Sequence, residues 1–356
     1  MPGKFEWTDF NNVDLDNQFF DSLKIDYPEF PEWFSKKKYQ HEKALVFHDE
    51  KGIGAFVYLK EENEPLELDS QTLSAVPRLK IGTLRLAERF RGQRLGEGAI
   101  GVSLWKWQES MAKEIYVTVF EKHELLINLF TTFGFENIGK NSRGEFIFLK
   151  SRDKINYSTP KKAFPFINPN ITKAGLIPIF DNFHDRLFPY SEIQGNNDEI
   201  EEITAGNGIS KIFLASPGSA LHYTKNEPVL IYRIFTGNGQ KTYKSVVTSY
   251  CTVSKVEVIK TYNRCNYSLE DFLKLTGNKT VFSVDELTSM YNEKKNLVIL
   301  ELVYNGYFGK GNNINHRTLS EHKLFETYPY NIEYSKEDFR NILTMGNVQI
   351  DNIIID

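Results

Sequence analysis

The residues with the clearest chemical potential form a glycine-rich stretch, RFRGQRLGEGAI, which begins at Arg89. A β-like run, LKIGTLRL, precedes it, and apolar residues at helical spacing follow it. Backbone amides at the start of a helix are unpaired, and the helix dipole adds positive potential there. Gly92 and Gly96 let a phosphate approach the backbone, while Arg91 and Arg94 add positive charge. The stretch therefore predicts a phosphate or pyrophosphate site where a strand becomes a helix.

Two common phosphate-binding motifs do not fit this stretch. It contains no Gly-Lys-Ser/Thr, so it is not a P-loop. The strands before it are expected to be antiparallel, so the β-α-β order of a dinucleotide-binding motif is not met. A basic helix start that binds no ligand is the alternative interpretation.

At this point the chain resembles the GNAT N-acetyltransferases. That family has a strand, an Arg-Gly-rich turn that opens a helix, a second strand, and a helix that ends in Gly-Phe. Here these segments are IGTLRL, RGQRLG, EIYVTVF and LFTTFGF. The resemblance implies acetyl-CoA as cofactor, with its pantetheine arm along a strand backbone and its pyrophosphate on the amides of the turn. The residues implied in cofactor binding are Leu86, Arg91, Gly92, Gln93, Arg94, Leu95, Gly96, Glu97 and His123.

Three residues depart from the GNAT pattern. Arg94 stands where the family usually has a glycine, and we expect it to keep a negative φ and to offer its charge to a phosphate. His123 stands where an asparagine commonly touches the cofactor, and it can still donate one hydrogen bond. Phe130 replaces a tyrosine that protonates the leaving thiolate in many members. The chain therefore uses another acid, uses water, or does not catalyse.

Acetyl transfer to an amine also needs a base that takes the proton from nitrogen. The candidates are Tyr116 and Thr118, which share one face of a predicted strand, and His123, which titrates near neutral pH. The sequence does not choose among them, because Tyr116 and Thr118 also suit strand packing and His123 also suits a helix cap. Neither Cys251 nor Cys265 lies in the GNAT-like part, so we expect direct attack of the amine on the thioester.

The pattern of elements divides the chain into three parts. Residues 1–150 alternate strand and helix patterns, which predicts an α/β (α+β) GNAT fold around a mixed sheet. Residues 151–205 are rich in proline and are predicted to form a connector. Residues 206–356 are again β-rich, with helices that begin in capping-box patterns at Ser268 and Ser283. This last part resembles the PUA-like small β-barrel domains, which include the ASCH and EVE types.

The second resemblance implies RNA or tRNA as a partner. Tyr232 and Tyr250 could stack on bases, and Arg233 and Lys244 could contact phosphates, although strand tyrosines also pack in barrels. Two functions stay open. One is an acetyl-CoA-dependent N-acetyltransferase whose PUA-like domain binds RNA or an RNA-linked substrate. The other is a non-catalytic protein, regulatory or defence-related, that binds acyl-CoA and nucleic acid.

Composition limits the other classes. The net charge of −4 argues against a strongly basic nucleic-acid binder, so RNA affinity would need a local patch. No apolar run of about 18 residues predicts a membrane span, and the N-terminus has no secretory segment. The two cysteines and the scattered histidines have no metal-ligand spacing, so we expect no metal. We expect a cytoplasmic, prokaryotic protein, and the sequence does not determine its oligomeric state.

Overall fold

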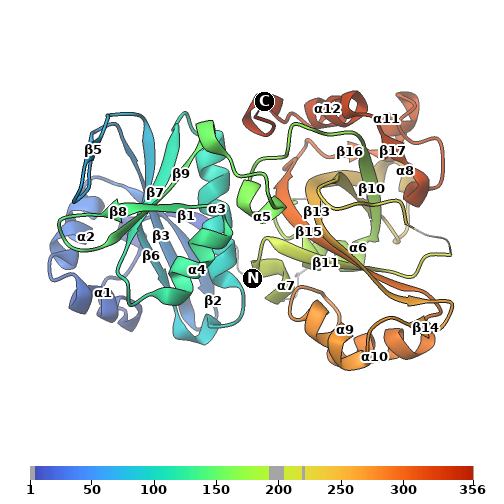
Figure 1. Ribbon diagram of the computed structural model, residues 1–356, viewed down its shortest axis with the longest axis horizontal. Coiled ribbons are helices and arrows are strands. Elements are labelled where there is room, and N and C mark those ends of the chain that lie inside the picture. Colours follow the sequence, from blue (N-terminus) through green and yellow to red (C-terminus); the bar gives the residue numbers. More distant parts are fainter. Residues whose placement is uncertain (1–4, 192–203, 219–220, 356) are drawn as a thin grey trace. The chain divides into compact units, whose positions relative to one another are not determined.

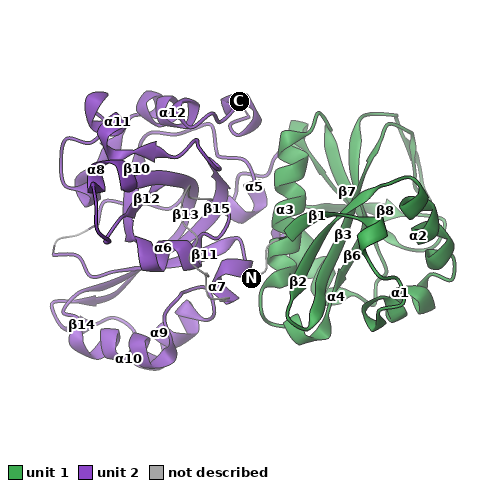
Figure 2. Ribbon diagram, turned by 180° about the vertical axis from the view of Figure 1, so that it is seen from behind, with its two compact units in different colours: residues 1–131, 135–154 green, residues 132–134, 155–356 purple. Residues whose placement is uncertain are grey.

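The computed structural model describes residues 5–191, 204–218 and 221–355. The chain divides into two compact units (Figure 2). Unit 1 comprises residues 1–131 and 135–154, and unit 2 comprises residues 132–134 and 155–356. Among the described residues, every helix is too short or too polar to cross a membrane.

Unit 1 is built on a seven-stranded mixed sheet (Figure 1). All neighbouring strands are antiparallel except β6 and β7, which run parallel. The strands, in their order across the sheet, are β1 (Phe5–Asp9), β2 (Lys43–Asp49), β3 (Gly52–Glu62), β6 (Arg78–Leu86), β7 (Glu114–Val119), β9 (Phe146–Ser151) and β8 (Glu136–Lys140). A separate small hairpin joins β4 (Leu66–Glu67) to β5 (Thr72–Leu73). The predicted α/β class with a mixed sheet is confirmed.

The parallel pair diverges after a short ladder. Paired residues run from Arg78 with Glu114 to Ile81 with Val117, and the described ladder then ends. On its other side, β6 stays paired with β3 as far as Leu86. The β3–β6 register shifts next to Gly82, which is an extra residue in β6 and increases the local twist. One edge of β6 therefore lacks a strand partner at its carboxyl end.

Four α-helices accompany this sheet: α1 (Asp21–Asp26), α2 (Phe30–Tyr39), α3 (Leu95–Glu109) and α4 (Glu124–Thr132). Short 3-10 turns add η1 (Phe10–Asn12), η2 (Gln18–Phe20), η3 (Glu88–Phe90) and η4 (Arg152–Lys154). An aromatic cluster that includes Phe10, Phe20 and Phe34 packs α1 and α2 against the sheet. Helix α2 contains Pro31 in its first turn, where the missing N–H costs nothing.

Unit 2 is built on a second mixed sheet of eight strands (Figure 1). The main path is β11 (Ser210–Ala215), β15 (Leu297–Tyr307), β13 (Val246–Thr261), β12 (Pro228–Ile234), β10 (Ala174–Phe180) and β17 (Glu333–Tyr334). Two short strands, β14 (Arg264–Cys265) and β16 (Ile314–Asn315), pair with β13. The small closed barrel implied by the second resemblance is not seen, because the described end strands β11 and β17 do not pair with each other.

The segment that the sequence predicts as a connector contributes to this second sheet. Strand β10 pairs in parallel with β12, and helix α6 (Asp181–Leu187) follows it directly. Pro178 interrupts the β pattern, yet β17 pairs only with the first two residues of β10, so the proline lies where β10 is an edge strand. Within the predicted connector, residues 192–203 lie outside the described residues.

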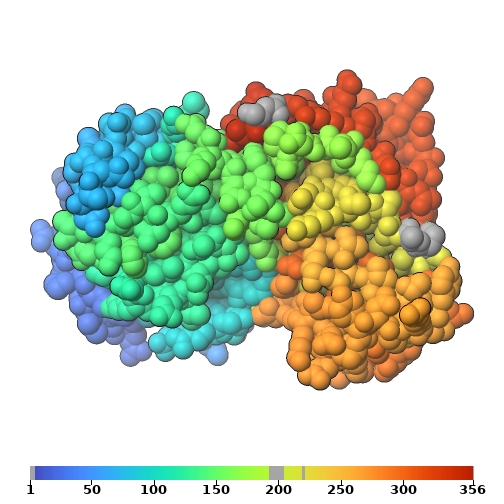
Figure 3. Space-filling view, in the orientation of Figure 1, coloured from blue at the N-terminus to red at the C-terminus, as the bar shows by residue number. Residues whose placement is uncertain are grey.

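The remaining helices of unit 2 lie around its sheet. They are α5 (Pro160–Ala163), α7 (Thr204–Asn207), α8 (Lys241–Lys244), α9 (Leu269–Thr276), α10 (Val284–Glu293), α11 (His316–Glu321), α12 (Lys336–Met345), and the 3-10 turns η5 (Pro329–Asn331) and η6 (Ile350–Asn352). Ser283 forms the predicted capping box with Glu286, and Ser268 accepts from the Asp271 amide. Phe272 and Leu287 anchor α9 and α10 to the sheet, and Figure 3 shows this segment in orange on the surface of unit 2.

Candidate functional site

The glycine-rich turn lies where the sequence predicts it, between β6 and α3. Gly92 has φ +76° and Arg94 has φ +62°, so both adopt the left-handed conformation. The expectation that Arg94 keeps a negative φ is therefore wrong. A non-glycine residue in this conformation costs about 1–2 kcal/mol.

The first turn of α3 presents backbone donors. The first intrahelical bond runs from the Gly98 amide to the Arg94 carbonyl, at 3.1 Å. Within the described residues, the amides of Leu95 and Gly96 have no hydrogen-bond partner, and Arg94 at the N-cap supplies no side-chain cap. An anion at this point would satisfy these donors and the positive end of the helix dipole.

The three arginines of the stretch differ in what they contact. Arg89 donates two hydrogen bonds to the carboxylate of Asp49, at 3.0 and 2.7 Å, and others to carbonyls of β3. Arg94 is mostly buried and donates to the carboxylate of Glu97, at 3.1 and 2.8 Å. Arg91 is exposed, and its guanidinium has no ion pair or hydrogen bond among the described residues. Arg91 is therefore the arginine best placed to meet a phosphate.

Gly96 has a packing role as well. A Cβ atom at this position would lie 3.0 Å from Leu86 Cδ1 and 3.4 Å from Leu129 Cδ2. The missing side chain thus lets α3 start close to the end of β6 and to α4. The predicted cofactor residue Leu86 ends the β6 edge that lacks a strand partner, beside this turn.

His123 precedes α4 and lies next to the end of β7. Its amide donates to the Phe120 carbonyl, and its carbonyl accepts from the amides of Leu126 and Ile127. Partial burial and the neighbouring Lys122 lower the pKa of His123, so the ring is neutral at neutral pH. A neutral imidazole on an exposed residue can donate one hydrogen bond and accept another.

Tyr116 lies away from the open edge of β6. It faces Lys80 in the ladder that is still paired, and its buried hydroxyl donates to the carboxylate of Glu62. Burial and the Glu62 carboxylate raise the pKa of Tyr116 well above its ordinary value. Thr118 follows on the same face and pairs with Ile147 of β9. Among the described residues, no hydrogen bond joins Tyr116, Thr118 and His123 to one another.

Phe130 is fully buried and packs edge-to-face on Phe135, with ring centroids 5.0 Å apart. It provides no proton donor. The structure instead shows a polar pair that the sequence did not suggest: Tyr27 donates to the buried carboxylate of Glu145, at 3.1 Å, and Asn141 donates to it at 2.8 Å. Tyr27 packs near Phe120 at the end of β7, with ring centroids 5.9 Å apart. Because Tyr27 and Glu145 are far apart in sequence, no local pattern connects them.

The residues predicted to contact RNA are mostly inside unit 2. Tyr232 and Tyr250 belong to its apolar core, where their rings pack on Phe325 and Phe308. Arg233 is buried and bound to Asp185. As placed, these three side chains offer no stacking face or phosphate contact at the surface. Lys244 is exposed and lies over the Phe235 ring.

In the described ranges, His, Cys, Asp and Glu side chains do not gather in any group that could hold a metal ion.

No family model and no curated protein matches the chain. Parts of it are similar to solved structures. One is a NatC complex bound to Gag peptide and CoA, at 14% identity and a TM-score of 0.29, over 42% of this chain and 99% of that one. Another is the PaiA N-acetyltransferase of Thermoplasma acidophilum in complex with coenzyme A. The sequence identity is 14% and the TM-score 0.33, and the match covers 42% of this chain and 99% of that one. A mutant ZmASCH protein of Zymomonas mobilis matches with 11% sequence identity and a TM-score of 0.30. This match covers 48% of this chain and 94% of that one. Similarities of this size carry no argument about function.

Proposed function

We propose that unit 1 binds acetyl-CoA and transfers its acetyl group to an amine. The observation that carries this proposal is the start of α3, where the amides of Leu95 and Gly96 have no partner in the described part of the chain and lie beside the left-handed Gly92 and the exposed Arg91. A pyrophosphate would bind these amides, and Arg91 would add a charge-assisted contact. The pantetheine arm would pair with the open edge of β6 near Leu86. Bound acetyl-CoA supplies a thioester as acyl donor.

The chemistry proposed is direct attack of a neutral amine on the thioester carbonyl. This step breaks the C–S bond, forms an amide and leaves a thiolate that needs a proton. Unit 1 contains no cysteine, so a cysteine acyl-enzyme in this unit is excluded. The proton transfers stay unassigned among His123, Tyr116, Thr118 and water, because the described side chains converge on no single base.

The second candidate is an acyl-CoA-binding protein without turnover. Buried Phe130, which replaces a hydroxyl donor, favours this candidate. Calorimetric titration with CoA tests binding, and release of free thiol from acetyl-CoA with a panel of amines tests transfer. CoA binding with no thiol release for any amine would favour the second candidate. Absence of CoA binding would contradict both.

A finer part of the proposal concerns RNA as a partner of unit 2. Tyr243 is 45% exposed, its hydroxyl contacts Arg317, and Lys241 and Lys244 lie on the same short helix, α8. Proteins bind single-stranded RNA with exposed aromatic rings, on which bases stack, and with nearby cations, which contact the phosphates. Double substitution of Lys241 and Lys244 by alanine should weaken RNA binding and flatten its salt dependence. If wild-type protein binds neither tRNA nor single-stranded RNA at low salt, this part is wrong.

A further inference from the structure

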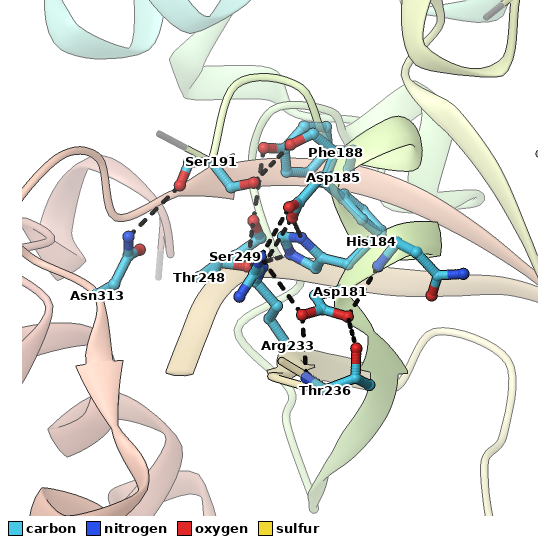
Figure 4. Close-up of polar contacts among 12 residues, drawn as sticks. Asp181, His184, Asp185, Phe188, Ser191, Arg233, Thr236, Thr248, Ser249 and Asn313 are labelled. Atoms are coloured by element: carbon cyan, nitrogen blue, oxygen red, sulfur yellow. Dashed lines mark hydrogen bonds and ion pairs between the residues drawn. The ribbon is translucent and has the colours of Figure 1, made fainter. Parts of the chain in front are cut away.

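Unit 2 contains two groups of buried titratable side chains, and in the first group every such side chain has a hydrogen-bond partner. Arg233 on β12 donates two hydrogen bonds of 2.8 Å each to Asp185 on α6. Asp185 lies 2.7 Å from His184 Nδ1, and His184 Nε2 lies 2.7 Å from the Thr248 hydroxyl on β13 (Figure 4). This series therefore ties α6 to β12 and β13.

The second group lies where the chain enters β12, and it is not fully paired. The side chain of Glu227 is 2% exposed. Its Oε2 accepts from the Thr224 amide at 2.8 Å and from the Thr224 hydroxyl at 3.1 Å. Its Oε1 has no hydrogen-bond partner among the described residues. A buried carboxylate oxygen without a donor is destabilising while it is ionised, and binding of one proton removes the charge without requiring a cavity.

Two side chains connect Glu227 to neighbouring elements. Lys173, which precedes β10, places its Nζ 3.9 Å from Glu227 Oε2 and 2.8 Å from Oε1 of Glu333 on β17. His222 places its Nδ1 3.1 Å from Glu333 Oε1 and 3.8 Å from Glu227 Oε1. The ammonium group is therefore shared between two carboxylates and lies nearer to the exposed one. The cluster of Lys173, His222, Glu227 and Glu333 thus joins the segment 221–227 to β10 and β17.

The charge of this cluster depends on one proton. With a neutral imidazole, two carboxylates and one ammonium group leave one net negative charge, which an added proton cancels. Burial raises the pKa of Glu227, and the hydrogen bonds from Thr224 and the charge of Lys173 oppose this shift without cancelling it. The hydrogen bond from Lys173 lowers the pKa of Glu333. A proton on His222 would give Nε2 a buried N–H, for which the described residues offer no acceptor. The proton therefore binds at Glu227.

The other groups around Glu227 do not titrate in the same range. Burial raises the pKa of Tyr223, on the same segment, and of Tyr330, on η5, so both hydroxyls stay protonated. On the side of β10, Gly175 brings the backbone close, since a Cβ atom there would lie 3.1 Å from Glu227 Oε1. The titration of this region is therefore that of Glu227.

We propose that the cluster of Lys173, His222, Glu227 and Glu333 is a pH-sensitive switch in unit 2. At high pH Glu227 is ionised, and its Oε1, which lacks a donor within the described chain, weakens the attachment of the segment 221–227 to β10 and β17. At lower pH Glu227 binds one proton and the attachment tightens. The switch is independent of acetyl-CoA binding by unit 1.

The direction of the effect follows from linkage. Because the pKa of Glu227 is raised in the folded protein, the folded chain binds its proton more tightly than the unfolded chain does. The stability of unit 2 therefore rises as pH falls through this raised pKa, and the gain is complete below the ordinary value of 4.5. Asp185 acts in the opposite direction and at lower pH, since its pKa is lowered to about 2. The contributions of the two carboxylates are thus separable by pH.

The test follows the full chain by NMR with two readouts. The Glu227 carboxyl carbon, titrated between about pH 4 and 8, should have a midpoint above 4.5. Amide exchange, corrected for its intrinsic pH dependence, should show the Thr224 amide several-fold better protected at about pH 5 than at about pH 8. E227Q should remove this difference and keep the higher protection at both pH values. E337Q is the matched control, because Glu337 is an exposed glutamate of α12, and it should leave both readouts unchanged.

Two results would overturn the switch. One is a Glu227 midpoint at or below 4.5 in folded wild-type protein. The other is a Thr224 amide whose protection does not change with pH, or changes equally in wild type and E227Q. If E227Q does not fold, as judged by circular dichroism, K173M takes its place. Loss of the ammonium group should raise the Glu227 midpoint, and an unchanged midpoint would contradict the role of the cluster.

Discussion

Arg94 and Glu97 form an ion pair across the first turn of α3, with Arg94 Nη2 2.8 Å from Glu97 Oε2. The pair holds the side chain of a residue whose backbone is left-handed, at φ +62°. The pair also engages the Arg94 guanidinium, which the sequence analysis predicts to contact a phosphate. The glycine-rich turn is therefore stabilised by Arg94, whereas the exposed Arg91 guanidinium has no ion pair or hydrogen bond among the described residues.

The first prediction separates the strain at Arg94 from its ion pair. R94G relieves the left-handed strain but loses the pair with Glu97, whereas R94A keeps the strain and loses the pair. We expect R94G to be more stable than R94A by about 1 kcal/mol in urea unfolding. Equal stabilities, or a more stable R94A, would contradict the left-handed conformation of this residue.

The second prediction concerns Arg91. R91A should weaken CoA binding about tenfold, because it removes one charge-assisted phosphate contact of about 1.4 kcal/mol. R94A should change CoA affinity less, since Arg94 is already paired with Glu97. Calorimetric titrations at a single low salt concentration compare the two variants with wild type. A larger loss in R94A than in R91A would reverse the assignment.

The third prediction concerns His123. H123N keeps a side-chain donor at the start of α4 and should retain CoA affinity, while H123A should lose it several-fold. Because the pKa of His123 is lowered, the ring is already neutral at pH 7, and affinity should not change between about pH 7 and 8. A rise or fall in affinity through this interval in wild type, absent in H123N, would show that a charged His123 contributes.

The fourth prediction concerns acid stability of unit 2. The pKa of Asp185 falls from 3.8 to about 2 on folding, so its contribution is complete above about pH 4 and is lost as pH falls through about 2. The difference corresponds to about 2 kcal/mol. R233M should be destabilised by about 3–5 kcal/mol at neutral pH, because Asp185 would stay buried without its partner. Urea unfolding at several pH values measures both the acid dependence and the stability of R233M. If the stability of D185N falls as steeply in acid as that of wild type, the role of Asp185 is contradicted.

The sequence predicts unit 1 well where the signal is local. The strand, the glycine-rich turn and the helix follow one another within about 30 residues, and their residue types express the structure directly. The conformation of Arg94 was missed because a left-handed arginine has no sequence signature. Nor does any local pattern join Tyr27 to Glu145.

Unit 2 was harder to predict because its central strands are buried on both faces. Residues 228–233 of β12 are all buried. An alternation of apolar and polar residues therefore cannot show which side chains of this strand face the core and which face the surface. Tyr232 and Arg233 were therefore expected at the surface and are found inside. The sequence does not predict strand β10, because its Pro178 belongs to a proline-rich stretch that is typical of loops. The series from Arg233 to Thr248 depends on pairing across three elements, which only the fold reveals.

The most direct test of the central claim is to follow backbone amide resonances of the labelled full-length protein during titration with CoA. If the start of α3 binds the pyrophosphate, the amides of Leu95 and Gly96 should shift with one saturating curve, and R91A should need about tenfold more CoA for the same shift. Amides of helix α12, which belongs to unit 2, should stay unchanged in the same titration. Saturating shifts that appear only outside Gly92 to Glu97, or no shifts at all, would contradict the account.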